Sequence, residues 1–115
     1  MTSAQDIYPD PLTSAVEVHM QKIANALLEY REVRGELPKG NNAAMVKALQ
    51  ALNPRAFRKS ELNARGEVID PWNRPYVYEA PGQIFQGLFD LYSIGSDGAG
   101  KTRPSERIIC PLMRL

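Results

Sequence analysis

The sequence predicts an α+β domain in which a long N-terminal α-helix packs on a small three-stranded antiparallel sheet, accompanied by a second short helix. Two observations predict this fold: apolar residues recur every three or four positions early in the chain, and alternating β-branched and aromatic runs follow residue 75. With 115 residues, the chain has the length of one domain, which we take as 1–115.

The first helix is expected over Leu12 to Arg34. Residues three or four positions apart lie on one face of a helix, so an apolar stripe with this spacing predicts a helix packed on a core. The stripe consists of Leu12, Val16, His19, Met20, Ile23, Leu27, Tyr30 and Val33. A second apolar face is suggested by Val18, Ala24 and Leu28.

Capping residues mark the ends of both predicted helices. The first helix begins at Asp10, which precedes a proline, or at Ser14, and it stops at Gly35. The second, shorter helix begins at Asn41 or Asn42 and ends before the Asn-Pro pair at 53–54. Its inward-facing residues are expected to be Met45, Leu49 and Leu52.

The predicted strands lie in the second half of the chain. Tyr76–Glu79 and Phe89–Ile94 alternate in the manner of strands, and the proline and glycines between them suit a hairpin connection. Arg107–Cys110 is expected to add the third strand. Between the second helix and the sheet, we expect an irregular surface connection with a short extended piece at Glu67–Ile69.

Charge and cysteine content narrow the possible functions. The net charge of +1 provides no overall field that would attract nucleic acid or anionic lipid. The single cysteine, Cys110, cannot form an internal disulfide and is expected to be a small buried residue. No apolar run approaches the roughly 20 residues that cross a bilayer, and the first residues do not resemble a signal peptide.

Residue types that often carry catalysis occur here in contexts that predict structural roles. His19 is the only histidine and lies within the helix stripe, which favours packing. Ser93 is not part of a GxSxG nucleophile elbow. Three aspartates stand in turn, strand and loop contexts, which favour local roles over paired-carboxylate catalysis: Asp70, Asp90 and Asp97. We therefore expect no catalytic residues and no enzyme.

Basic residues in the connection after the second helix raise the question of nucleic-acid binding. Arginine and lysine next to an aromatic residue is a pattern found in such interfaces. Two glutamates, Glu61 and Glu67, dilute this cluster, so a solvated connection is favoured and no nucleic-acid partner is expected. The cluster consists of Arg55, Phe57, Arg58, Lys59 and Arg65.

The glycine loop, Gly95–Thr102, matches the letters of a phosphate-binding P-loop, GxxxxGK[ST]. That motif works at the start of a helix, and the Arg-Pro pair at 103–104 prevents a helix from continuing here. Binding of a phosphate or a divalent ion by a monomeric module built on this loop remains the alternative function.

Three blocks of sequence together resemble the G-type major pseudopilin of type II secretion, within the type IV pilin-like superfamily. They are GELP at 35–38, DPWNRPYVY at 70–78 and FDLYSIGSDG at 89–98. The resemblance implies a structural subunit that assembles with other pseudopilins and the secretion machinery into a pseudopilus that drives export of folded proteins. It also implies a full-length form anchored in the inner membrane and facing the periplasm, through an N-terminal segment that this chain lacks.

The resemblance also implies a structural role for the aromatic and proline block, which packs the turn leading into the sheet. Prolines fix backbone angles, and large rings bury apolar area against the long helix. Where the family usually has glycine, this chain has Asn73, a residue that tolerates a positive φ. The structural turn consists of Asp70, Pro71, Trp72, Pro75 and Tyr76.

Members of the family also bind calcium in the loop that follows the FDLYSIGSDG block, through acidic residues further along the chain, which implies a Ca²⁺ site here. Asp97 and Glu106 are the carboxylates at suitable positions. Basic residues nearby oppose a divalent cation and replace several of the acids of the family: Lys101, Arg103 and Arg107.

Overall fold

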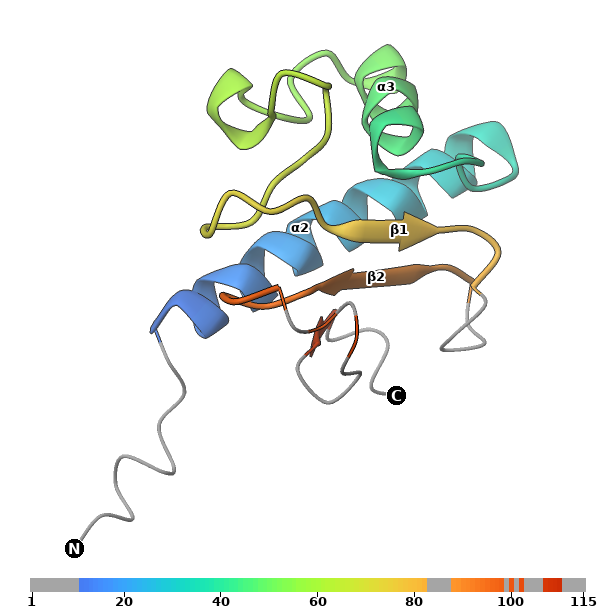
Figure 1. The fold of residues 1–115 in the computed structure, drawn as a ribbon. Coiled ribbons are helices and arrows are strands. Elements are labelled where there is room, and N and C mark those ends of the chain that lie inside the picture. Colours follow the sequence, from blue (N-terminus) through green and yellow to red (C-terminus); the bar gives the residue numbers. More distant parts are fainter. Residues whose placement is uncertain (1–10, 83–87, 99, 101, 103–106, 111–115) are drawn as a thin grey trace, which may run out of the picture.

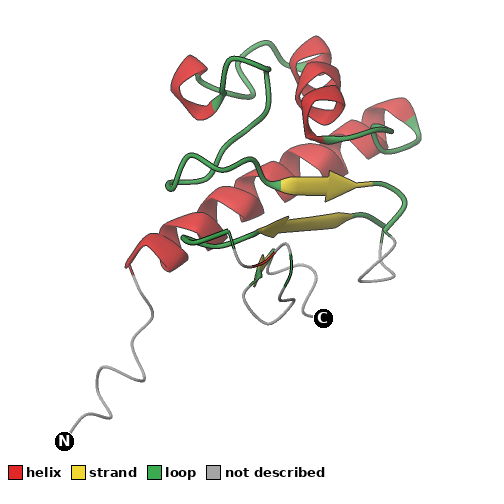
Figure 2. Cartoon of the chain, viewed as in Figure 1, coloured by secondary structure: helices red, strands yellow, loops and turns green. Residues whose placement is uncertain are grey.

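The computed structural model describes residues 11–82, 88–98, 100, 102 and 107–110. The predicted α+β architecture is confirmed: a long helix, a shorter helix and a three-stranded antiparallel sheet follow one another along the chain (Figure 2). The elements are α2 (Pro11–Arg34), α3 (Asn42–Leu52), the 3₁₀ helix η1 (Lys59–Glu61), β1 (Val77–Glu79), β2 (Asp90–Ser93) and β3 (Ile108–Ile109).

Figure 1 shows the hairpin formed by β1 and β2 lying across α2, with α3 on the side of β1. The sheet order is β1-β2-β3, and both pairings are antiparallel. Tyr78 stands opposite Leu91, and Tyr92 stands opposite Ile109. The observed strands are shorter than the predicted ones, because fewer residues pair in the ladder than alternate in the sequence.

The predicted apolar stripe of α2 forms the centre of the core. In its middle, Val16, Met20, Ile23 and Leu27 are buried and the side chain of His19 is 18% exposed, whereas Leu12 and Val33, near the two ends of the helix, are 43% and 60% exposed. Ala24, expected on a second face, is buried as well. The helix begins at Pro11, so Ser14 lies inside it. The central core residues of α2 are Val16, Met20, Ile23, Ala24 and Leu27.

Gly35 ends α2 as predicted, with a positive φ of 86° that glycine adopts without strain. Asn41 caps α3, because its side-chain oxygen accepts a hydrogen bond from the N–H of Ala44 at 3.1 Å. Two of the expected inward residues of α3, Met45 and Leu49, are buried, and Leu52 is half-buried.

Asn42 has a role that the sequence did not predict. It is 4% exposed, and its amide group donates to the carbonyl oxygens of Val68 at 2.9 Å and Tyr76 at 2.8 Å. Its side-chain oxygen accepts from the N–H of Val68 at 2.8 Å. These three hydrogen bonds join the first turn of α3 to two segments that arrive much later in the chain.

The connection between α3 and the sheet is more ordered than predicted. It contains η1 and two isolated antiparallel bridges, Leu62 with Val68 and Ile69 with Pro75. The second bridge pairs Ile69, at the end of the expected extended piece, with Pro75, which lies just before β1. Among the described residues, no helix combines the length and the apolar character needed to cross a membrane.

Candidate functional site

The turn at residues 70–76 is organised by the buried side chain of Asp70, which is 3% exposed. Its Oδ1 accepts hydrogen bonds from the backbone N–H groups of Trp72 and Arg74, both at 2.9 Å. Backbone hydrogen bonds between Asp70 and Arg74 and between Asn73 and Asp70, also at 2.9 Å, close the same turn. One carboxylate oxygen therefore holds the whole tight turn, which is the use of aspartate expected at such positions.

The second oxygen of the same carboxylate joins this turn to the sheet. Oδ2 of Asp70 accepts a hydrogen bond from the hydroxyl of Ser93 at 2.8 Å, and Ser93 Oγ accepts one from the N–H of Gly95 at 3.1 Å. Two of the sequence blocks on which the resemblance depends are thus hydrogen-bonded to each other inside the domain. The sequence offered no signal for this contact beyond the presence of both blocks.

The remaining residues of the turn occupy distinct environments. Asn73 has a φ of 63°, the left-handed conformation for which its side chain is suited. Trp72 is partly buried against the core and Tyr76 is 1% exposed, whereas Pro71 is exposed. The ring of Tyr76 meets His19 of α2 edge to face, with ring centroids 5.3 Å apart.

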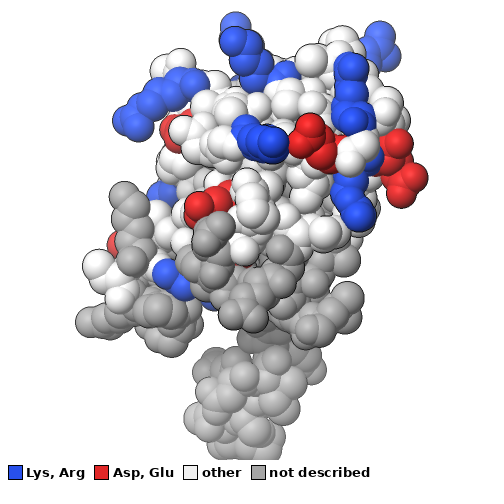
Figure 3. Space-filling model, turned by 90° about the vertical axis from the view of Figure 1, so that its right-hand side faces the viewer, with Lys and Arg blue, Asp and Glu red and all other residues white. Residues whose placement is uncertain are grey.

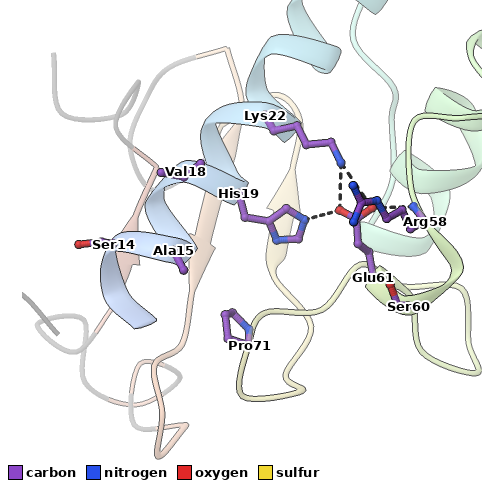
Figure 4. A pocket seen from close by; sticks show the side chains of 9 residues that line it. All are labelled: Ser14, Ala15, Val18, His19, Lys22, Arg58, Ser60, Glu61 and Pro71. Carbon is purple, nitrogen blue, oxygen red and sulfur yellow. Dashed lines mark hydrogen bonds and ion pairs between the residues drawn. The ribbon is translucent and has the colours of Figure 1, made fainter. Parts of the chain in front are cut away.

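A groove of about 630 Å³ lies between the N-terminal half of α2 and η1 (Figure 4). His19 and Lys22 extend from α2 toward Glu61 across this groove. His19 Nε2 is 2.7 Å from Glu61 Oε1, and Lys22 Nζ is 3.1 Å from the same oxygen. The lining residues are Ser14, Ala15, Val18, His19, Lys22, Arg58, Ser60, Glu61 and Pro71.

The electrostatics of the groove define the direction of its hydrogen bonds. Burial, reinforced by the negative charges of Asp70 and Glu61, raises the pKa of Tyr76 above its ordinary value, so its hydroxyl stays protonated. That hydroxyl lies 2.8 Å from His19 Nδ1, and the Nε2–H on the other side of the ring donates to the carboxylate of Glu61, which can only accept.

The carboxylate of Glu61 accepts hydrogen bonds from three residues: His19, Lys22 and Arg58. Burial acts to raise its pKa, but the hydrogen bonds from the backbone N–H of Arg58, from Lys22 and from His19 outweigh burial and lower the pKa. The chain Tyr76–His19–Glu61 therefore ties the segment before β1 to α2 and η1 around an ionised carboxylate. His19 packs as the sequence predicted, but these polar contacts were not predicted.

The basic cluster in the connection after α3, for which the sequence favours a solvated connection over nucleic-acid binding, contains one aromatic residue, Phe57. Phe57 is 7% exposed and belongs to the core, so its ring is not available for stacking on a base. On the face shown in Figure 3, acidic side chains are interspersed among the basic ones. Cys110 is fully buried beside Met20, as predicted from its isolation in the sequence.

The glycine loop is closed by its own backbone and approached by two arginines. The N–H of Gly100 donates to Ile94 O at 2.9 Å. Arg74 Nη2 donates to Ser96 O at 3.1 Å, and Arg107 Nε donates to Gly100 O at 3.1 Å. After this loop, the next element that the structure describes is β3, whereas a P-loop is followed directly by a helix.

Only one of the two carboxylates predicted to bind calcium lies within the described residues. Asp97 is exposed on the glycine loop, and Glu106 lies outside the described residues. Within the described part of the chain, no three His, Cys, Asp or Glu side chains come together as a metal site. Two carbonyl oxygens of the loop, those of Ser96 and Gly100, accept hydrogen bonds from the guanidinium groups of Arg74 and Arg107.

Comparison with known proteins identifies the family. A family model described as "Type II secretion system (T2SS), protein G" matches residues 11–111. The type II secretion system core protein G of Pseudomonas aeruginosa is 60% identical over 30 residues, which cover 26% of this chain and 20% of that protein. The matched stretch thus spans about a fifth of the length of that relative. No solved structure matches the chain. Because the family match covers almost all of the described fold, the chain belongs to the type II secretion system protein G family.

Proposed function

We propose that this chain is the globular part of a pseudopilin, a structural subunit that assembles with other copies into the pseudopilus of a type II secretion system. The family match over residues 11–111 carries this proposal. The long helix covered on one side by a small antiparallel sheet supports it, because such a helix leaves its other side available to neighbours. The subunit acts by assembly, so we propose no catalytic role.

The outer side of α2 offers the surface for that assembly. Val18 is 72% exposed and Val33 is 60% exposed, and both are large apolar side chains. They lie about four helical turns apart, which places them on the same side of the helix. Burying exposed apolar side chains of this kind against another subunit is the ordinary driving force of association. We propose that neighbouring copies contact α2 along this side.

The compartment follows from the same proposal. A pseudopilin in its full-length form is held in the inner membrane and presents its globular part to the periplasm. Its partners are other copies, other pseudopilins and the secretion machinery, and its task is the export of folded proteins. The globular part itself needs no nucleic acid for this work.

The experiment that tests this function is genetic complementation in the bacterium that encodes the chain. Deletion of the gene is expected to retain type II substrates inside the cell, and the wild-type gene to restore their release. Val18→Asp and Val33→Asp are expected to abolish restoration, although the purified variants melt at the wild-type temperature. Ala64→Asp, at an exposed position of the connection, is the matched control and is expected to restore release.

Two results would contradict the proposal. A deletion strain that releases its substrates normally would remove the role in secretion. Full activity of both Val18→Asp and Val33→Asp would leave the role in secretion but exclude this side of α2 as the assembly surface.

A further inference from the structure

Two arginines from different parts of the chain direct positive charge into the glycine loop. Arg74 comes from the turn before β1 and donates to Ser96 O, while Arg107 precedes β3 and donates to Gly100 O, each at 3.1 Å. We propose that these guanidinium groups take the place that a bound calcium ion would occupy, so that the loop is held closed without metal. The inference concerns the loop alone and stands whether or not the chain assembles.

Arg74 is fitted to the loop by its surroundings. Its backbone is fixed by Asp70, which accepts from its N–H and donates to its carbonyl oxygen. Its guanidinium group lies against Gly98: a Cβ at that position would stand 2.9 Å from Nη1 and 3.2 Å from Cζ. Gly98 also has a φ of 75°. Glycine at 98 therefore gives the guanidinium group the space in which it lies.

Arg107 is held at the other end of the loop by an aromatic ring. Its Cζ lies 4.7 Å from the centroid of the Tyr92 ring, within the range of a cation–π contact. Tyr92 belongs to β2 and is 7% exposed, so it is itself fixed by the sheet. The ring of Tyr92 thus helps to hold the guanidinium group in the position from which it donates to the carbonyl oxygen of Gly100.

The chemistry of these contacts opposes a divalent ion. Calcium needs six to eight oxygen ligands, among which backbone carbonyls are common. A guanidinium group stays charged at any physiological pH, so each arginine here occupies a carbonyl oxygen and places a permanent positive charge beside it. The same two groups that would repel calcium also satisfy the loop oxygens that calcium would otherwise bind.

The backbone of the loop closes without help from an ion. The N–H of Gly100 bonds Ile94 O at 2.9 Å, and the N–H of Gly98 bonds Gly95 O at 3.3 Å. A Cβ at Gly100 would stand 2.6 Å from Ile94 Cα, so only glycine permits this approach. The arginines therefore act on a loop that its own backbone hydrogen bonds already close, and they hold two further carbonyl oxygens, those of Ser96 and Gly100.

Amide hydrogen exchange of the loop, measured on the whole chain, tests the proposal. In the wild-type protein, the amides of Gly98 and Gly100 are expected to exchange equally slowly in millimolar CaCl₂ and in EDTA, and the melting temperature is expected to be the same in both. In Arg74→Gln, the loop amides are expected to exchange faster by on the order of tenfold, while amides in the middle of α2 keep their rates.

Arg65→Gln is the matched control, because Arg65 has an 83% exposed side chain on the connection and its removal should leave the loop unchanged. Arg107→Gln is a second variant that tests the other end of the loop. Gly98→Ala is expected to speed loop exchange at least as much as Arg74→Gln, because it displaces the same guanidinium group and also places alanine at a φ of 75°.

Three results would overturn the inference. Calcium that raises the melting temperature of the wild-type protein, or that slows exchange in its loop, would show that the loop binds the ion. Loop exchange in Arg74→Gln equal to that in Arg65→Gln would show that the arginine does not hold the loop. The wild-type comparison remains decisive even if the variants fail to fold.

Discussion

The hydroxyl of Ser93 donates a 2.8 Å hydrogen bond to Oδ2 of Asp70, a residue 23 positions earlier in the chain. Both side chains are almost completely buried, and the other oxygen of Asp70 holds the turn that precedes β1. This contact explains in physical terms why the two sequence blocks occur together. The carboxylate that shapes the turn needs a partner on its second oxygen, and the strand provides it.

Removal of that partner should therefore destabilise the domain. Ser93→Ala leaves Oδ2 of Asp70 buried without its donor and also removes the acceptor for the N–H of Gly95. A buried polar group that loses its partner costs about 1 to 3 kcal/mol. Denaturant unfolding of Ser93→Ala should show a loss in this range, whereas Ser96→Ala, at an exposed position, should leave the free energy of unfolding unchanged.

The coupling between the two residues can be measured in a double-mutant cycle. Asp70→Ala should cost more than Ser93→Ala, because the turn also loses its capping oxygen. The double variant should lose less unfolding free energy than the two single variants lose when their losses are added. Strict additivity in the cycle is the result that contradicts a direct energetic link.

Backbone conformation at Asn73 gives a second prediction. Its φ of 63° is favourable for glycine, tolerated by asparagine and strained for alanine. Asn73→Ala should be less stable than Asn73→Gly by about 1 kcal/mol. The two variants control for each other, since both remove the same side-chain amide. Equal melting temperatures would mean that the turn changes conformation when the asparagine is lost.

The carboxylate of Glu61 gives a prediction about pH. Its pKa is lower in the folded protein than the ordinary value of 4.5, so folding favours the ionised form. The resulting stabilisation is present above the pKa of the unfolded chain and disappears as the pH falls through the folded pKa. Wild-type protein should be more stable than Glu61→Gln at neutral pH, and this difference should shrink as the pH falls below about 4.5.

Thermal unfolding between pH 3 and pH 7 (about the range over which carboxylates titrate) measures this difference. Ser96→Ala, a substitution at an exposed position that carries no titratable group, provides the control and is expected to follow the wild-type protein across this pH range. A difference in stability between wild type and Glu61→Gln that stays constant down to about pH 3 would contradict the prediction.

Trp72 is predicted to contribute to stability by packing. Its ring is partly buried against the core, so Trp72→Ala should lose about 2 kcal/mol of unfolding free energy, somewhat less than full burial of a ring provides. Trp72→Phe should retain most of it. Chemical denaturation followed by circular dichroism measures both variants, since the substitutions remove the only tryptophan. A fully stable Trp72→Ala would leave the turn dependent on Asp70 alone.

The parts of the fold that follow from local sequence were predictable, and the parts that depend on distant partners were not. The stripe of α2 and the glycine stop at its end are visible because their residues lie within a few positions of one another. The His19–Glu61 contact joins residues 42 positions apart, and no periodic pattern records such a pair. Only the block resemblance, which reflects the whole fold, pointed to the region where Asp70 meets Ser93.

The buried amide of Asn42 also has a consequence for the order of folding. Its three hydrogen bonds require Val68 and Tyr76, which lie 26 and 34 positions later, so they form only after a long stretch of chain has been placed. Closing such a stretch costs chain entropy before the contact returns any energy. α3 therefore reaches its final position only once the segments at Val68 and Tyr76 are in place, and Asn42→Ala leaves both segments without this anchor.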